Sequence, residues 1–143
     1  MKQLNKKIKF NYEILETIES GIVLLGPEVK SIRDGKLSFG DSFAYIKNNE
    51  VWLLNLHISP YSLDTVLKPE PTRKRKLLLK KSEIRKLSEK LKKGSGLTLI
   101  PASIYQKKKY IKCELALCKG KKLHDKRETL RERNFKREAK KFL

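Results

Sequence analysis

The hydrophobic pattern begins with a run over residues 12–25, in which apolar and β-branched side chains mix with polar ones. Gly21 interrupts the run, and a long strand that bends at a glycine is typical of small closed sheets. Residues 26–35 then predict a short helix, because Pro27 suits the first turn of a helix and Gly35 suits its C-terminal cap.

Alternating apolar and polar positions return over residues 41–54, where two short segments flank Asn48 and Asn49. Asparagine tolerates the left-handed conformation that a two-residue turn requires, so this segment predicts a β-hairpin. An extended segment continues to Pro60. A loop is expected over residues 62–76, and it ends in the basic sequence RKRK.

The clearest helix covers residues 81–94, with Ser82 as its expected N-cap and Gly94 as its expected end. One narrow apolar stripe runs along it, formed by Ile84, Leu87 and Leu91. Two further strands follow, at residues 97–106 and 110–118, and three lysines join them. The sequence therefore predicts strands in hairpins with a covering helix.

These elements predict a mainly β fold with flanking helices, specifically an OB-like closed antiparallel barrel of about six strands over residues 1–124. A split α+β sandwich is the alternative. Cys113 and Cys118 lie five positions apart in one predicted strand. Residues an odd number apart point to opposite faces of a strand, so we expect two reduced thiols and no metal site.

The C-terminal segment, residues 125–143, has no single apolar stripe, so it is not expected to pack as an ordinary core helix. It does carry pairs of opposite charges at helical spacing, such as Glu132 and Lys136, and it contains no glycine or proline. We therefore expect a basic tail that is disordered in the free protein and becomes helical when phosphates neutralise its cations.

Charge is the strongest compositional signal. The chain has 35 basic and 16 acidic residues, a net charge of +19. An excess of this size favours a polyanionic partner. No apolar run is long enough for a membrane span and no secretory signal begins the chain, so we expect a cytoplasmic protein with no membrane partner. We expect a monomer.

No catalytic pattern is present. The sequence lacks a glycine-rich phosphate loop, a zinc-protease motif and a serine elbow, so we expect no enzyme activity and no cofactor. Basic clusters lie beside aromatic residues instead, for example Lys107–Lys109 beside Tyr105 and Tyr110. RNA-binding surfaces use cations for phosphate and rings for unpaired bases. A ribosomal or general structured-RNA-binding protein fits this composition, and an RNA-modifying enzyme is a weaker alternative.

Several stretches, taken in order, resemble one family, the SsrA-binding proteins or SmpB family. The stretches are NYEILETIESGIVLLGPEVKSIRDGK, DSFAYIKNNEVWLLNLHISPY, PTRKRKLLLKKSEIRKL, GLTLIPASIY, KCELALCKGKKLHDKR and RERNFKRE. They cover nearly the whole chain. The resemblance implies binding to the tRNA-like domain of transfer-messenger RNA and its delivery to stalled ribosomes for trans-translation. It implies indirect partnership, through the RNA, with elongation factor Tu and alanyl-tRNA synthetase.

The resemblance also implies site residues. In the body, Glu19, Leu78 and Lys112 match positions that contact RNA in the family. Basic residues expected to add RNA contacts are Lys30, Arg33, Arg73, Arg75 and Lys76. The sequence HDKR matches the family segment for the ribosomal decoding centre, and the tail is expected to enter the empty mRNA channel. The tail residues expected to contact the ribosome are Lys121, Lys122, His124, Asp125, Lys126, Arg127, Arg131, Arg133, Lys136 and Arg137.

Overall fold

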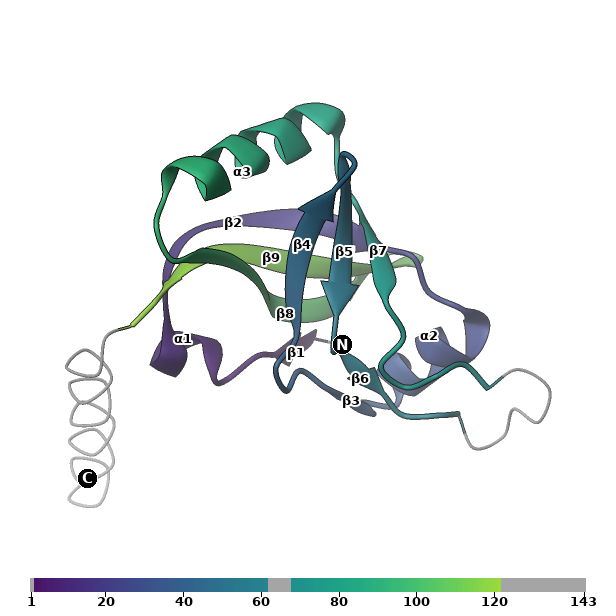
Figure 1. The fold of residues 1–143 in the computed structure, drawn as a ribbon. Coiled ribbons are helices and arrows are strands. Elements are labelled where there is room, and N and C mark those ends of the chain that lie inside the picture. Colours follow the sequence, from purple (N-terminus) through teal and green to yellow (C-terminus); the bar gives the residue numbers. More distant parts are fainter. Residues whose placement is uncertain (1, 62–67, 122–143) are drawn as a thin grey trace, which may run out of the picture.

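A computed structural model describes residues 2–61 and 68–121 of the chain (Figure 1). These residues form nine strands and three helices. In chain order they are β1 (Lys2–Leu4), α1 (Ile8–Asn11), β2 (Tyr12–Ile22), α2 (Gly26–Arg33), β3 (Leu37–Ser38), β4 (Phe43–Lys47), β5 (Glu50–Leu54), β6 (His57–Ile58), β7 (Arg75–Leu78), α3 (Lys81–Lys93), β8 (Leu97–Lys107) and β9 (Tyr110–Gly120).

Six of these strands pair in a closed ring, in the order β8, β4, β5, β7, β2 and β9, and β9 pairs with β8 to close it. Every pairing is antiparallel. Strand β1 pairs with the later part of β8, while β4 meets β8 near its start, at the pair Ala44 and Leu99. The prediction of a mainly β fold with flanking helices is confirmed.

The interior of the ring holds the main hydrophobic core. Alternate residues of β9 point into it, among them Cys113, Leu115 and Leu117. Helix α2 adds Ile32, which is fully buried, and α3 adds its two buried apolar residues, Ile84 and Leu87. Figure 1 shows α3 lying over the strands, with α1 and α2 on opposite sides of the molecule.

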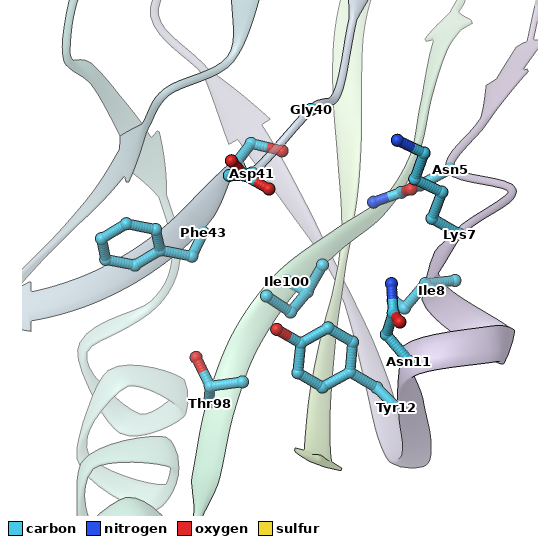
Figure 2. Close-up of a pocket in the computed structure, with 11 residues that line it drawn as sticks. Asn5, Lys7, Ile8, Asn11, Tyr12, Gly40, Asp41, Phe43, Thr98 and Ile100 are labelled. Carbon is cyan, nitrogen blue, oxygen red and sulfur yellow. The ribbon is translucent and has the colours of Figure 1, made fainter. Parts of the chain in front are cut away.

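A second, smaller core lies beneath α1. It joins Ile8 of α1 to Ile100 of β8 (Figure 2) and to Ala116 and Cys118 of β9. Cys113 and Cys118 therefore lie in different cores, as the odd spacing predicted, and both are free thiols. Burial raises the pKa of Cys113 to about 12 and that of Cys118 to about 11.

Two local bulges shape the long strands. The register of β2 against β9 shifts between Ile14 and Glu16, and that of β8 against β9 shifts between Pro101 and Ser103. Proline has no N–H group for a sheet, and a bulge is a place where a strand can accommodate it. The carbonyl of Pro101 accepts a hydrogen bond from Asn5 Nδ2 at 2.9 Å, which ties the segment before α1 to β8.

The hairpin prediction is confirmed, because Asn48 and Asn49 both have positive φ, 52° and 59°, between β4 and β5. The predicted cap of α3 is wrong. The helix begins at Lys81 with Lys80 as its N-cap, and the Glu83 carboxylate accepts the N–H of Lys80 at 2.9 Å. Ser82 lies inside the first turn. Glu83 rather than Ser82 therefore satisfies a free donor at this helix start.

One further expectation changed, and two elements were missed. The predicted loop over residues 62–76 ends early, because Arg75 and Lys76 belong to β7. Strand β1 and helix α1 were not predicted, because their lysine-rich sequence gives little apolar periodicity. The predicted boundary between residues 124 and 125, and the predicted disordered tail, lie outside the described residues.

Candidate nucleic-acid interface

One row of paired residues runs across four strands of the ring. Leu78 of β7 pairs with Gly21 of β2, and Gly21 pairs on its other side with Lys112 of β9. Lys112 in turn pairs with Tyr105 of β8. Residues directly opposite one another in antiparallel strands share a face of the sheet. The fold therefore brings together Leu78 and Lys112, which are 34 positions apart in the sequence, and places Glu19 two residues before Gly21.

Because Gly21 has no side chain, the surface is depressed at this row. A Cβ atom at this position would lie 3.2 Å from Cβ of Leu78, so the glycine lets the Leu78 side chain lie close against the β2 backbone. A shallow pocket of about 300 Å³ opens here, and its lining includes Leu78, Lys112 and Tyr110. Leu78 is 53% exposed and Tyr110 is 67% exposed. An apolar side chain and a ring are therefore available beside a cation.

Glu19 is held in place by its neighbours on β8. Its carboxylate accepts a hydrogen bond from the Tyr105 hydroxyl, and Lys107 Nζ lies 3.3 Å from its other oxygen. The hydrogen bond from Tyr105 and the charge of Lys107 lower the pKa of Glu19. Burial, and then the Glu19 carboxylate, raise the pKa of Tyr105. Glu19 is thus an ionised acceptor that also orients a ring and a cation.

Cations lie over aromatic rings along the same surface. Lys112 Nζ is 5.7 Å from the centre of the Tyr110 ring, and Lys74 Nζ is 4.8 Å from that of Trp52. Trp52 pairs with Lys76 across β5 and β7, so the rings and cations extend from β9 to β5. The contribution of Trp52 was not predicted. Its position opposite Tyr45 in the hairpin was the available sequence signal.

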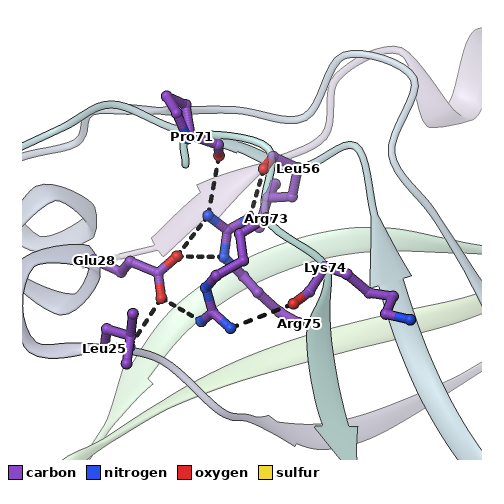
Figure 3. A network of polar contacts seen from close by, with 7 residues as sticks. All are labelled: Leu25, Glu28, Leu56, Pro71, Arg73, Lys74 and Arg75. Carbon is purple, nitrogen blue, oxygen red and sulfur yellow. Dashed lines mark hydrogen bonds and ion pairs between the residues drawn. The ribbon is translucent and has the colours of Figure 1, made fainter. Parts of the chain in front are cut away.

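A buried ion network fixes the backbone beside this surface (Figure 3). The Glu28 carboxylate of α2 lies 2.6 Å from a guanidinium nitrogen of Arg73 and 2.6 Å from one of Arg75. Arg75 also donates to the carbonyl oxygens of Leu56, at 2.6 Å, and Pro71, at 3.0 Å. Glu28 is 2% exposed and Arg75 is fully buried. The network therefore joins α2, β7 and the segments on either side of residues 62–67.

Arg75, which was predicted to contact RNA, is buried in the structure. Its guanidinium has 0% exposure and its hydrogen bonds are used inside the protein. The burial of Arg75 could not be predicted from the basic sequence RKRK, because sequence alone does not show which of the four cations points inward. Arg73 is partly exposed but is engaged by Glu28. Lys30 and Arg33 are exposed on α2, and Lys76 is partly exposed and lies 3.7 Å from Glu50.

Of the predicted tail contacts, Lys121 is within the described residues, where its N–H donates to the carbonyl of Asn11 at 2.9 Å. The other nine, from Lys122 to Arg137, lie outside them. Among the residues that the structure describes, no cluster of three metal-ligating side chains is present. No helix in that part of the chain is long and apolar enough to cross a bilayer.

Comparison with known proteins gives a consistent result. The model of the family described as SmpB protein matches residues 2–143. The SsrA-binding protein of Borreliella burgdorferi is 54% identical over 134 residues, covering 94% of this chain and 89% of the relative. That of Trichodesmium erythraeum is 52% identical over 134 residues, covering 93% and 85%. That of Streptococcus mutans is 49% identical over 142 residues, covering 96% and 91%.

A solved structure is also similar. It is described by the words "tmRNA-SmpB: a journey to the center of the bacterial ribosome". Its chain is 45% identical to this one, with a TM-score of 0.73 over 91% of this chain and 94% of that chain. Sequence and fold agree over almost the full length. The chain therefore belongs to the SmpB family of SsrA-binding proteins.

Proposed function

We propose that this protein binds the tRNA-like domain of transfer-messenger RNA and delivers it to stalled ribosomes for trans-translation. The observation that carries the proposal is the row Leu78, Gly21 and Lys112, which gathers residues from three strands at one pocket in a chain of this family. The ring of strands is an OB-like barrel in this interpretation, and it acts by binding rather than by catalysis.

Each residue of the row has a distinct role in this proposal. Leu78 gives apolar contact to an unstacked base, and Lys112 pairs with a phosphate, because single-stranded loops of RNA offer both groups. Glu19 accepts hydrogen bonds from base or ribose donors while it holds Tyr105 and Lys107. Lys30, Arg33, Arg73 and Lys76 add charge around this contact. Gly21 lets the Leu78 side chain lie close to the β2 backbone, which sets the position of this apolar contact.

The tail has a separate role. We propose that residues 125–143, with Lys121, Lys122 and His124 before them, contact the decoding centre and the mRNA channel of the ribosome. Elongation factor Tu and alanyl-tRNA synthetase are indirect partners that act on the RNA. Support for this division comes from the resemblance of the HDKR sequence to the family and from the density of cations there.

Two measurements test the proposal. Deleting residues 125–143 is expected to leave affinity for the tRNA-like domain nearly unchanged while it abolishes tagging on stalled ribosomes. A collapse of RNA affinity in this variant would contradict the division of roles. Affinity of the full chain is expected to fall by roughly 10³–10⁵-fold between 50 and 200 mM salt if 6–10 phosphates are engaged. A flat salt response would contradict the electrostatic account.

The main alternative is a general structured-RNA-binding protein, which the net charge of +19 also fits. A competition assay separates the two. Unlabelled tRNA-like domain should displace the labelled RNA at much lower concentration than an unrelated folded RNA of equal length. Equal competition by both RNAs would favour the alternative, because phosphate contacts alone do not distinguish sequences or folds.

A further inference from the structure

A second hollow lies at the start of β2 (Figure 2), whereas Gly21 lies near the end of that strand. It is lined by side chains from α1, from the start of β2 and from β8, and by the segment that leads into β4. Tyr12 lines this hollow and lies nine positions before Gly21, which corresponds to roughly 30 Å along a strand. The hollow is therefore distinct from the proposed contact with the tRNA-like domain.

The lining combines an apolar wall, two rings and several hydrogen-bonding groups. Ile8 and Ile100 form part of the second core and give the wall, and Tyr12 and Phe43 pack against that core. The polar groups that line the hollow are the side chains of Asn5, Asn11, Asp41, Ser42 and Thr98, with Lys7 beside them. This lining suits a ligand that is flat and apolar on its faces and polar at its edges.

Ser42 indicates that the hollow is suited to a polar ligand. The residue is 2% exposed, and its Oγ has no hydrogen-bond partner within the protein. Its backbone N–H donates to the carbonyl of Phe39 at 2.9 Å. A buried hydroxyl without a partner is costly, and a ligand or a water molecule that bonds to it removes that cost.

The size and charge of the hollow limit the kinds of ligand that it can bind. Its volume is about 190 Å³, below the roughly 300–1,000 Å³ of pockets for drug-sized molecules, so it suits a single small ring system. The Asp41 carboxylate disfavours a free anion and accepts hydrogen bonds from N–H groups, which bases carry at their edges. Lys7 adds a cation to the lining, and this cation can attract a phosphate attached to such a ring.

We propose that this hollow binds one unstacked nucleotide of a single-stranded RNA segment. The base lies against the apolar wall with its edge on Ser42 and the neighbouring polar groups, and its phosphate lies toward Lys7. This inference rests on the proposed function, because RNA is the partner that supplies such a nucleotide. Lys121, the last residue that the structure describes, lies next to this hollow, because its N–H donates to the carbonyl of Asn11. RNA that contacts Lys121 would therefore lie beside the hollow, because Asn11 lines it.

The first test uses mononucleotides and the free, full-length protein. AMP, GMP, CMP and UMP are titrated separately while amide NMR signals are recorded, with ribose 5-phosphate as the control ligand. At least one mononucleotide should give saturable shifts centred on Asn5, Ser42 and Thr98. Ribose 5-phosphate should give none of comparable size. The proposal is overturned if no mononucleotide shifts these signals, or if ribose 5-phosphate shifts them equally, because then charge alone would explain the binding.

A pair of matched variants isolates the hydroxyl. Ser42→Ala should weaken mononucleotide binding about fivefold, the effect of one lost hydrogen bond. Ser103→Ala is the control, because Ser103 is 1% exposed and also has an unpartnered Oγ, but it does not line this hollow. Phe43→Leu is a second variant that reduces ring contact without removing a buried polar group. Equal affinity in all three variants and the parent chain would refute the assignment.

The source of the nucleotide is tested with two RNAs. Ser42→Ala and Phe43→Leu are compared with the parent chain for binding to the tRNA-like domain and to isolated small ribosomal subunits. A loss of several-fold with one of them identifies the RNA that supplies the nucleotide. Unchanged affinity for both would overturn the proposal. Because failure of the proposed function would instead abolish selective binding of the tRNA-like domain by the parent chain, the two failures are distinguishable.

Discussion

The ion network between Glu28, Arg73 and Arg75 gives a quantitative prediction for the substitution Glu28→Gln. Glutamine keeps the shape of the side chain but removes its charge. The Arg75 guanidinium then stays buried, with 0% exposure, without the carboxylate that lies 2.6 Å away. Its bonds to Leu56 and Pro71 remain, but those partners are neutral carbonyl groups. The variant thus leaves a buried charge uncompensated.

The expected cost follows from comparable sites. Removing one partner of a buried ion pair costs about 3–5 kcal/mol. Glutamine retains one acceptor oxygen, which can still take a hydrogen bond from Arg75 or Arg73, so we expect the lower end, about 3 kcal/mol. For a chain of 143 residues, 1 kcal/mol changes the midpoint of thermal unfolding by about 3–4 °C, so the midpoint should fall by roughly 10 °C.

Urea unfolding measures this directly, because the single tryptophan, Trp52, is half-buried in the ring and reports unfolding by fluorescence. The midpoint should fall while the slope of the free energy against urea stays unchanged. Glu50→Gln is the matched control. Glu50 faces Lys76 at 3.7 Å with both side chains about 40% exposed, so its loss should cost less than about 1 kcal/mol. Equal losses in the two variants would refute the reasoning.

The same network predicts a pH dependence. Burial raises the pKa of Glu28, but hydrogen bonds from Arg73 and Leu25 and the charge of Arg75 outweigh it, so the pKa in the folded state is lowered. A lowered carboxyl pKa stabilises the fold above the unfolded-state pKa, and that stabilisation is lost as the pH falls through the folded pKa. The stability difference between the parent chain and Glu28→Gln should therefore be constant near pH 7 and shrink under acid conditions. A difference that persists unchanged below pH ~3 would contradict this.

Three further predictions concern the surface and the thiols. Lys112→Ala should reduce the slope of log affinity against log salt by about 0.9, the value for one phosphate contact, whereas Lys86→Ala on α3 should leave the slope unchanged. Leu78→Ala should weaken binding of the tRNA-like domain by about 1 kcal/mol with a stability change within about 0.5 kcal/mol, because Leu78 is 53% exposed; a large loss of stability would instead assign Leu78 to the core. Iodoacetamide at pH 8 should label Cys113 and Cys118 only after urea is added, because both thiols are buried with raised pKa values, and mass spectrometry of the native protein would reveal any exception.

The sequence predicted the elements whose local signals agree with their environment. The hairpin turn follows from Asn48 and Asn49, and α3 follows from its apolar stripe and the glycine after it. The convergence of Leu78, Gly21 and Lys112 could not be derived from local pattern, because strand register is fixed by contacts between segments far apart in the chain. The resemblance named Leu78 and Lys112, but it gave no reason for their proximity.

One physical cause of the failures is that a charged side chain looks the same in sequence whether it faces water or the interior. Arg75 lies in a run of four cations, and only the buried Glu28, 47 positions earlier, makes it a core residue. Helix α1 and strand β1 carry few apolar residues, and their places depend on bonds such as that from Asn5 to Pro101. Tertiary contacts decide such segments, so a local pattern does not reveal them.

The pairing of β1 with β8 has a consequence for handling the protein. Strand β8 has one edge on β9, and its other edge is shared by β4 and β1. If β1 were removed or pulled away, the backbone N–H and C=O groups between Ser103 and Tyr105 that point toward β1 would lose their partners, while those that point toward β9 would stay paired. An unpaired strand edge is a template for pairing with another chain. Lys2–Leu4 thus protect this edge from pairing with another chain, and removing them should promote aggregation before it affects RNA binding.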